Sequence, residues 1–141
     1  MESSRSFRPL IDRLRNVGLR PTRQRLALAR LLFDKADRHV SAEQLHAEAL
    51  EHAIRVSLAT VYNTLNQFTG AGLLREVVVA PGRSYFDTNI GNHHHFYVED
   101  SGQLHDIPGE QVVVQALPAV PAGTEISRVD VVVRLRTTPK Q

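Results

Sequence analysis

Apolar residues in the first half of the chain recur every three or four positions, the spacing of amphipathic helices. This pattern predicts four helices, over residues 7–17, 23–33, 42–52 and 58–69. Small polar residues stand where a side-chain oxygen can cap a first turn, and a glycine stands just past the first helix. These residues are Thr22, Ser41, Ser57 and Gly18. The first half is therefore expected to be helical.

The helix over 58–69 is expected to have two different faces. Its apolar stripe consists of Leu58, Val61, Leu65 and Phe68. The outward face is expected to carry Thr60, Asn63, Thr64 and Gln67. No Asp or Glu occurs between Ser57 and Arg75, so nothing on this helix would repel phosphate. The pattern favours a DNA-recognition helix, although a core helix of another small domain would share the apolar stripe.

A hairpin pattern follows this helix, with strands over 74–79 and 84–87 around the turn Ala80-Pro81-Gly82. Helices followed by a short hairpin predict a winged helix-turn-helix DNA-binding domain over residues 1–87. In such a domain the helix before the wing enters the major groove of DNA.

The second half is predicted to be a small α/β dimerisation domain over residues 93–141, after a hinge over 88–92. Its expected elements are strands over 93–98, 103–107 and 126–136 and a helix over 110–117. In the last strand, Val129, Val131, Val133 and Leu135 alternate with polar residues, which indicates one buried face. A unit this small is marginal alone, so we expect a homodimer. The fold class is α+β.

Charge is distributed unevenly along the chain. Residues 1–83 carry 13 Lys and Arg against 8 Asp and Glu, whereas residues 84–141 carry 4 against 7. A basic first half suits a nucleic-acid binder, although a solvated surface would give the same balance.

The composition excludes several classes of function. The chain has no cysteine, so thiolate zinc sites, iron–sulfur clusters and disulfides are excluded. No apolar run is long enough for a membrane span, and the first residues do not resemble a signal peptide, so a cytoplasmic protein is expected. No nucleophile motif or phosphate-cradling glycine loop is present. A non-haem metal enzyme is the remaining enzymatic alternative, and we expect no enzyme.

Three consecutive histidines, His93, His94 and His95, begin the first strand of the second half. Imidazole is the commonest metal ligand among side chains. Alternate residues of a strand share a face, so His93 and His95 are expected on one side and His94 on the other. The cluster predicts a sensor for metal or haem; ordinary strand histidines are the alternative.

The sequence resembles the ferric uptake regulator (Fur) family in four stretches, and within it the iron response regulators (Irr). The stretches are residues 18–25, 39–43, 57–68, and 85–89 together with 93–96. The Irr resemblance depends mainly on the recognition helix, the triple histidine and residues 104–108.

The resemblance implies a homodimeric regulator of iron and haem genes that binds A·T-rich palindromic DNA. It implies that Arg20 enters a narrow minor groove, and that Tyr62 contacts base edges, especially a thymine methyl. Asn63 stands where many relatives carry arginine, and it could read adenine. The other implied contacts, to the backbone, phosphates or base edges, are Thr22, Arg23, Arg25, Ser57 and Thr60.

The resemblance also implies a sensor site whose ligands come from both domains. The matching residues are His39, Asp87, His93, His95 and Asp106. Their nitrogen and oxygen donors suit divalent Fe, Mn or Zn. Haem would bind at His93, His94 and His95, because the Cys-Pro haem motif of some Irr proteins is absent. No cysteine-bound structural zinc is expected. The alternatives are a metal-only Fur-type repressor and a peroxide-sensing relative.

Overall fold

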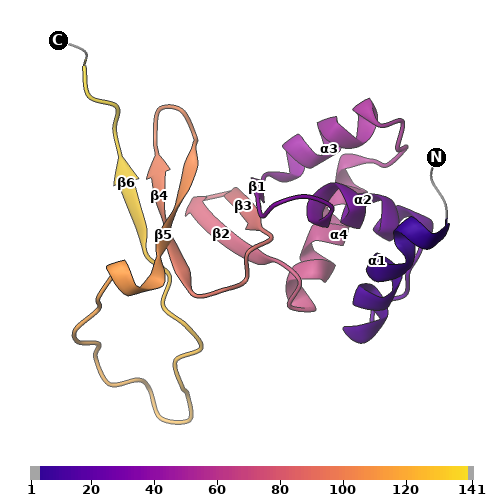
Figure 1. Cartoon of the computed structure of the whole chain (residues 1–141). Helices are drawn as coiled ribbons and strands as arrows, with labels where there is room; N and C mark the ends of the chain where they lie inside the picture. The colour runs from indigo at the N-terminus through magenta and orange to yellow at the C-terminus, as the bar shows by residue number, and fades with distance from the viewer. Residues whose placement is uncertain (1–3, 140–141) are drawn as a thin grey trace. The chain divides into compact units, whose positions relative to one another are not determined.

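The computed structural model describes residues 4–139 of the chain (Figure 1). The chain divides into two compact units, Met1–Ile90 and Gly91–Gln141. Each unit has its own three-stranded sheet, with strand order β1-β3-β2 in the first and β5-β4-β6 in the second. Within residues 4–139, no helix combines the length and the apolar character needed to cross a membrane.

The described part of the first unit contains four helices, as the apolar pattern predicted. They are α1 (Ser4–Asn16), α2 (Arg23–Phe33), α3 (Ala42–Glu51) and α4 (Leu58–Gly70). The three predicted caps are confirmed: Thr22, Ser41 and Ser57 each accept a hydrogen bond from a backbone N–H of the first turn. The Ser41 cap is reciprocal, because the Gln44 side chain accepts a bond from the Ser41 N–H at 2.9 Å. Local sequence therefore sets where α2, α3 and α4 begin.

The sheet of the first unit contains the predicted wing and one strand that the pattern missed. The wing strands are β2 (Arg75–Ala80) and β3 (Arg83–Asp87), paired antiparallel. The missed strand is β1 (His39–Val40), which pairs antiparallel with β3 and places His39 opposite Asp87. A strand of two residues is too short to show an alternation in sequence.

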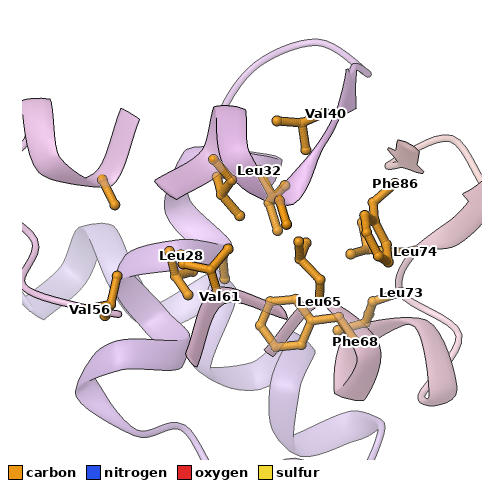
Figure 2. Packing of buried hydrophobic residues seen from close by; sticks show 14 of the residues in the cluster. Leu28, Leu32, Val40, Val56, Val61, Leu65, Phe68, Leu73, Leu74 and Phe86 are labelled. Atoms are coloured by element: carbon orange, nitrogen blue, oxygen red, sulfur yellow. The ribbon is translucent and has the colours of Figure 1, made fainter. Parts of the chain in front are cut away.

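The core of the first unit lies among the four helices and the wing (Figure 2). Val61, Leu65 and Phe68 are fully buried, which confirms most of the predicted inward stripe of α4. Thr64 departs from the prediction: it was expected on the outward face, but only 5% of it is exposed. It follows Val61 by three positions, so it lies beside that buried residue on the helix surface.

The second unit contains β4 (His93–Val98), β5 (Leu104–Pro108), the 3₁₀ turn η1 (Gly109–Gln111) and β6 (Val132–Leu135). The strand β4 pairs antiparallel with β5 and parallel with β6. The predicted helix over 110–117 is wrong, since residues 112–131 form neither helix nor strand. Two features oppose that helix: the β-branched run Val112-Val113-Val114, and Pro118, which disfavours helical backbone at the residue before it.

The predicted strand over 126–136 is also shorter than expected, and its apolar residues are not buried. Val133 and Leu135 are each 37% exposed. In the described part of this unit, Tyr97 and Ile107 are the buried apolar side chains. So small a core would not stabilise a free unit, which agrees with the expectation of a second copy.

Candidate metal centre and nucleic-acid interface

The first unit brings together two of the predicted metal ligands, His39 and Asp87. The Nε2 atom of His39 lies 3.3 Å from Oδ2 of Asp87, whose side chain is 1% exposed. The other carboxylate oxygen of Asp87 accepts a hydrogen bond from the Asn89 N–H at 2.9 Å. One oxygen therefore fixes the turn after β3, while the other faces the imidazole.

The backbone beside this pair is held by three residues that sequence reasoning did not identify. The Arg38 N–H donates to Oγ1 of Thr88 at 2.9 Å, and the Thr88 N–H donates to the Arg38 carbonyl at 3.1 Å. The guanidinium of Arg38 donates to both carboxylate oxygens of Glu48 in α3, at 2.8 and 2.5 Å. This bidentate pair raises the pKa of Arg38 and lowers the pKa of Glu48. The strand that carries His39 is thereby tied to α3.

The second unit brings together the other three predicted ligands. His93 and His95 share one side of β4, with ring centroids 4.6 Å apart. Their Nε2 atoms lie 3.6 and 3.5 Å from the same oxygen of Asp106, which comes from β5 opposite His95. Both imidazoles are buried, and the Asp106 side chain is 45% exposed. Three donor atoms therefore converge on one point.

The third histidine of the run serves a different contact. His94 is buried, and its Nδ1 accepts a hydrogen bond from the Val131 N–H at 3.1 Å. The Nδ1 of His93 lies 2.7 Å from the Gly91 carbonyl oxygen. Because a carbonyl only accepts, Nδ1 of His93 carries a proton, and Nε2 is the ring nitrogen that faces Asp106. The histidine run thus divides into two candidate ligands and one structural residue.

The donor sets in both units fit a divalent cation. Ligand atoms about 2.1 Å from a tetrahedral ion lie about 3.4 Å from one another. The nitrogen–oxygen separations of 3.3, 3.5 and 3.6 Å are close to that spacing. Imidazole nitrogen and carboxylate oxygen suit Fe, Mn and Zn, and the chain has no cysteine to hold a softer ion. The His/Asp set of each unit therefore consists of candidate ligands for a divalent metal.

A polar hollow opens in the first unit between the start of α2 and the outward face of α4. Its volume is about 440 Å³. Five of the predicted DNA-contacting residues line it, together with three other polar residues. The lining residues are Arg20, Thr22, Gln24, Arg25, Thr60, Asn63, Thr64 and Gln67. Two guanidinium groups and no carboxylate line the hollow, which suits an approaching phosphate backbone.

The guanidinium of Arg25, predicted to contact the DNA backbone, makes three hydrogen bonds within the protein. Its Nε and Nη2 atoms donate to Oε1 of Gln67 at 3.3 and 3.0 Å, and Nη1 donates to the Arg20 carbonyl at 2.9 Å. The guanidinium thus connects the loop before α2 to the outward face of α4 and fixes the position of the Arg20 backbone. Arg23 and Asn63 are exposed on the same unit.

Tyr62, the predicted base reader, lies on the surface of α4 and is 38% exposed. Its hydroxyl donates a hydrogen bond of 2.7 Å to a carboxylate oxygen of Glu43 in α3. This bond lowers the pKa of Glu43 and raises the pKa of Tyr62. Sequence reasoning missed Glu43, because an acidic residue in the first turn of a helix is ordinary on its own. Ser57 and Thr60 are joined through the cap of α4, where Oγ of Ser57 donates to Oγ1 of Thr60 at 3.0 Å.

Comparisons with known proteins agree with this arrangement. The model of the ferric uptake regulator family matches residues 16–134. A ferric uptake regulation protein of Cupriavidus metallidurans is 36% identical over 94 residues, 66% of this chain and 66% of that protein. The peroxide-responsive repressor PerR of Staphylococcus aureus is 32% identical over 102 residues, 72% of this chain and 68% of that protein. The chain thus matches about two thirds of the length of each of these relatives.

A solved structure is similar over nearly the whole chain. The ferric uptake regulator of Pseudomonas aeruginosa with manganese matches with a TM-score of 0.67 and 26% identity, covering 91% of this chain and 97% of that one. The predicted α+β class, with an N-terminal helical DNA-binding domain and a C-terminal β-sheet dimerisation domain, is thereby confirmed. The chain belongs to the ferric uptake regulator family of transcription regulators and is not an enzyme.

Proposed function

We propose that this protein is a cytoplasmic regulator that binds double-stranded DNA as a homodimer and responds to a divalent ion. The observation that carries the proposal is the convergence of His93 and His95 on one oxygen of Asp106, at 3.6 and 3.5 Å. Two neighbouring imidazoles beside a carboxylate are a donor set for Fe(II), Mn(II) or Zn(II). The family assignment supports reading that site as the sensor of a regulator.

We assign both ligand sets to one ion, so that His39 and Asp87 complete the coordination by His93, His95 and Asp106. The resemblance of the sequence to the sensor segments of the family supports this assignment, because it implies that all five residues are ligands of one site. An ion held by residues of two domains would favour one relation between them and could thereby control DNA binding.

We propose that DNA binds along α4 and the start of α2. Arg20 would enter the minor groove of an A·T-rich palindromic site, while Tyr62 and Asn63 would contact base edges in the major groove. Thr22, Arg23, Ser57 and Thr60 would contact phosphates or base edges, and Arg25 would hold Arg20 and Gln67 in place. The hollow lined by these polar and cationic groups supports the proposal.

We further propose that this regulator controls iron and haem genes. The site favours a regulator that responds to a metal ion alone over one that responds to haem. Haem at His93, His94 and His95 stays a prediction. All three imidazoles are buried, and Nδ1 of His94 is already hydrogen-bonded, so an ion suits this strand better than a porphyrin does. The similarity to PerR makes oxidation of ligand histidines by peroxide a second candidate response.

The test measures DNA binding by fluorescence anisotropy, with a duplex that the wild-type protein selects from a randomised library. Mn(II), Zn(II), anaerobic Fe(II) and haem are added separately to metal-free protein. We expect one divalent ion to change DNA affinity at least tenfold and haem to leave it unchanged. Failure of every ion would refute metal control, and a response to haem alone would restore the haem-sensing prediction.

Variants assign the ligands in the same assay. His93→Ala, His95→Ala and Asp106→Ala should abolish the response to the ion. His105→Ala is the matched control, since His105 is an exposed neighbour of Asp106 on β5. Calorimetric titration of metal-free protein should give one ion per chain. Two ions per chain, one of them lost in His39→Ala, would show that each ligand set binds its own ion.

A further inference from the structure

The proposed DNA-binding surface of the first unit includes one carboxylate that the acid-free sequence of α4 did not predict. Glu43 stands in the first turn of α3, and its Oε2 accepts the hydroxyl proton of Tyr62 at 2.7 Å. The positive charge of Arg83, the first residue of the wing strand β3, adds a smaller contribution to the lowered pKa of Glu43. Glu43 is therefore hydrogen-bonded to α4, the proposed recognition helix.

The negative charge of a carboxylate at this place opposes DNA binding. We therefore looked for a separate contribution of this side chain to recognition. DNA binding without sequence preference depends on cations that replace counterions along the phosphates, and an anion nearby weakens it for every sequence. The hydrogen bond to Tyr62 is different, because it restricts the orientation of a side chain that is otherwise exposed. A side chain held in one orientation before binding loses less freedom when it meets its base.

We propose that Glu43 is a specificity-determining residue of this DNA interface, which orients the Tyr62 ring towards the bases. This inference rests on the proposed function, since it assigns Tyr62 to base contact. Glu43 acts on recognition through its hydrogen bond to Tyr62, and this bond controls the ratio of affinities for selected and unselected DNA. Its charge separately lowers the affinity for every duplex.

The test compares two duplexes of equal length: one selected by the wild-type protein from a randomised library, and a G·C-rich duplex of unrelated sequence. Glu43→Gln removes the charge but keeps an acceptor oxygen, Glu43→Ala removes both, and Tyr62→Phe removes the hydroxyl. Glu51→Gln is the matched control, because Glu51 is an exposed carboxylate at the far end of the same helix. Affinities are measured at several salt concentrations in the presence of the activating ion.

We expect Glu43→Gln and Glu43→Ala to bind the unselected duplex about threefold more tightly than wild type, as loss of one nearby anion predicts. Glu43→Ala and Tyr62→Phe should each lower the selectivity ratio about fivefold, the effect of losing one exposed charge-assisted hydrogen bond. The double variant should lower it no further, because both single changes break the same bond. Glu51→Gln should leave the ratio unchanged.

Two outcomes would overturn the inference. One is a double variant whose loss equals the product of the two single losses, which would make Glu43 and Tyr62 independent. The other is an unchanged selectivity ratio in Glu43→Ala. Failure of the proposed function has a separate result: wild-type protein would then enrich no duplex and bind neither probe in a salt-dependent way.

Discussion

The ion pair between Arg38 and Glu48 gives a prediction whose size follows from its geometry. Both carboxylate oxygens accept from the guanidinium, and the two side chains are 29% and 30% exposed. Fully exposed pairs contribute about 0.2–1 kcal/mol, and hydrogen bonds to charged groups contribute about 1.5–3 kcal/mol. A bidentate pair with partial solvent screening should lie between them, so we expect a coupling of about 1–2 kcal/mol.

The measurement is a double-mutant cycle of Arg38→Met, Glu48→Gln and the combined variant, by urea unfolding at pH 7. Helical circular dichroism reports on the first unit, because the α-helices of residues 4–139 all lie there. The pair lowers the pKa of Glu48 from its ordinary 4.5 in the folded state. Its stabilisation should therefore be complete above about pH 4.5 and disappear as the pH falls through the lower folded value. A coupling below about 0.3 kcal/mol at pH 7, or one that persists after Glu48 is protonated, would refute this reasoning.

Three further predictions concern the core, a helix cap and the ion. Phe68→Ala should destabilise the first unit by about 3–5 kcal/mol in urea unfolding, because Phe68 is fully buried, whereas Leu50→Ala, at a side chain that is 58% exposed, should change stability by less than about 0.5 kcal/mol. Ser41→Ala should cost about 1 kcal/mol in the same assay, since it removes the hydroxyl oxygen that accepts from the Gln44 N–H at the start of α3; an unchanged midpoint would contradict that role. Removing the ion with a chelator should lower the thermal midpoint. The loss should be equivalent to about 2.7 kcal/mol if the free ion was present at 100 times its dissociation constant. The control variant His94→Ala should retain this response to the ion.

The first unit was predictable because its signals are local. Thr22, Ser41 and Ser57 each satisfy an N–H within three residues, so the sequence alone specifies where a helix can begin. Thr64 shows where this reasoning ends: its polarity suggested an outward position, but its place beside Val61 on the helix determines its burial.

The second unit was less predictable because its structure depends on distant pairing. The strand β6 pairs in parallel with β4, across the whole of β5 and the segment 112–131. The alternation of Val129, Val131, Val133 and Leu135 indicated a longer strand with a buried face. This single chain supplies a partner strand for only part of that pattern, and Val133 and Leu135 stay exposed. We therefore expect a second copy of the chain to cover Val133 and Leu135, which would explain the alternating pattern.

The two candidate sites also differ in how far the sequence could predict them, because one depends on local strand geometry and the other on the packing of two helices. The sequence could indicate His93 and His95 as a pair, because strand geometry places alternate residues on one face, and register explains the approach of Asp106. Glu43 had no comparable signal, since it meets Tyr62 across 19 residues and only through the packing of α3 against α4. Because α4 itself contains no acidic residue, its sequence predicted a DNA-binding surface without carboxylates. The charge of a DNA-reading face is a property of every helix that borders it, so it can be evaluated only after the helices have been packed.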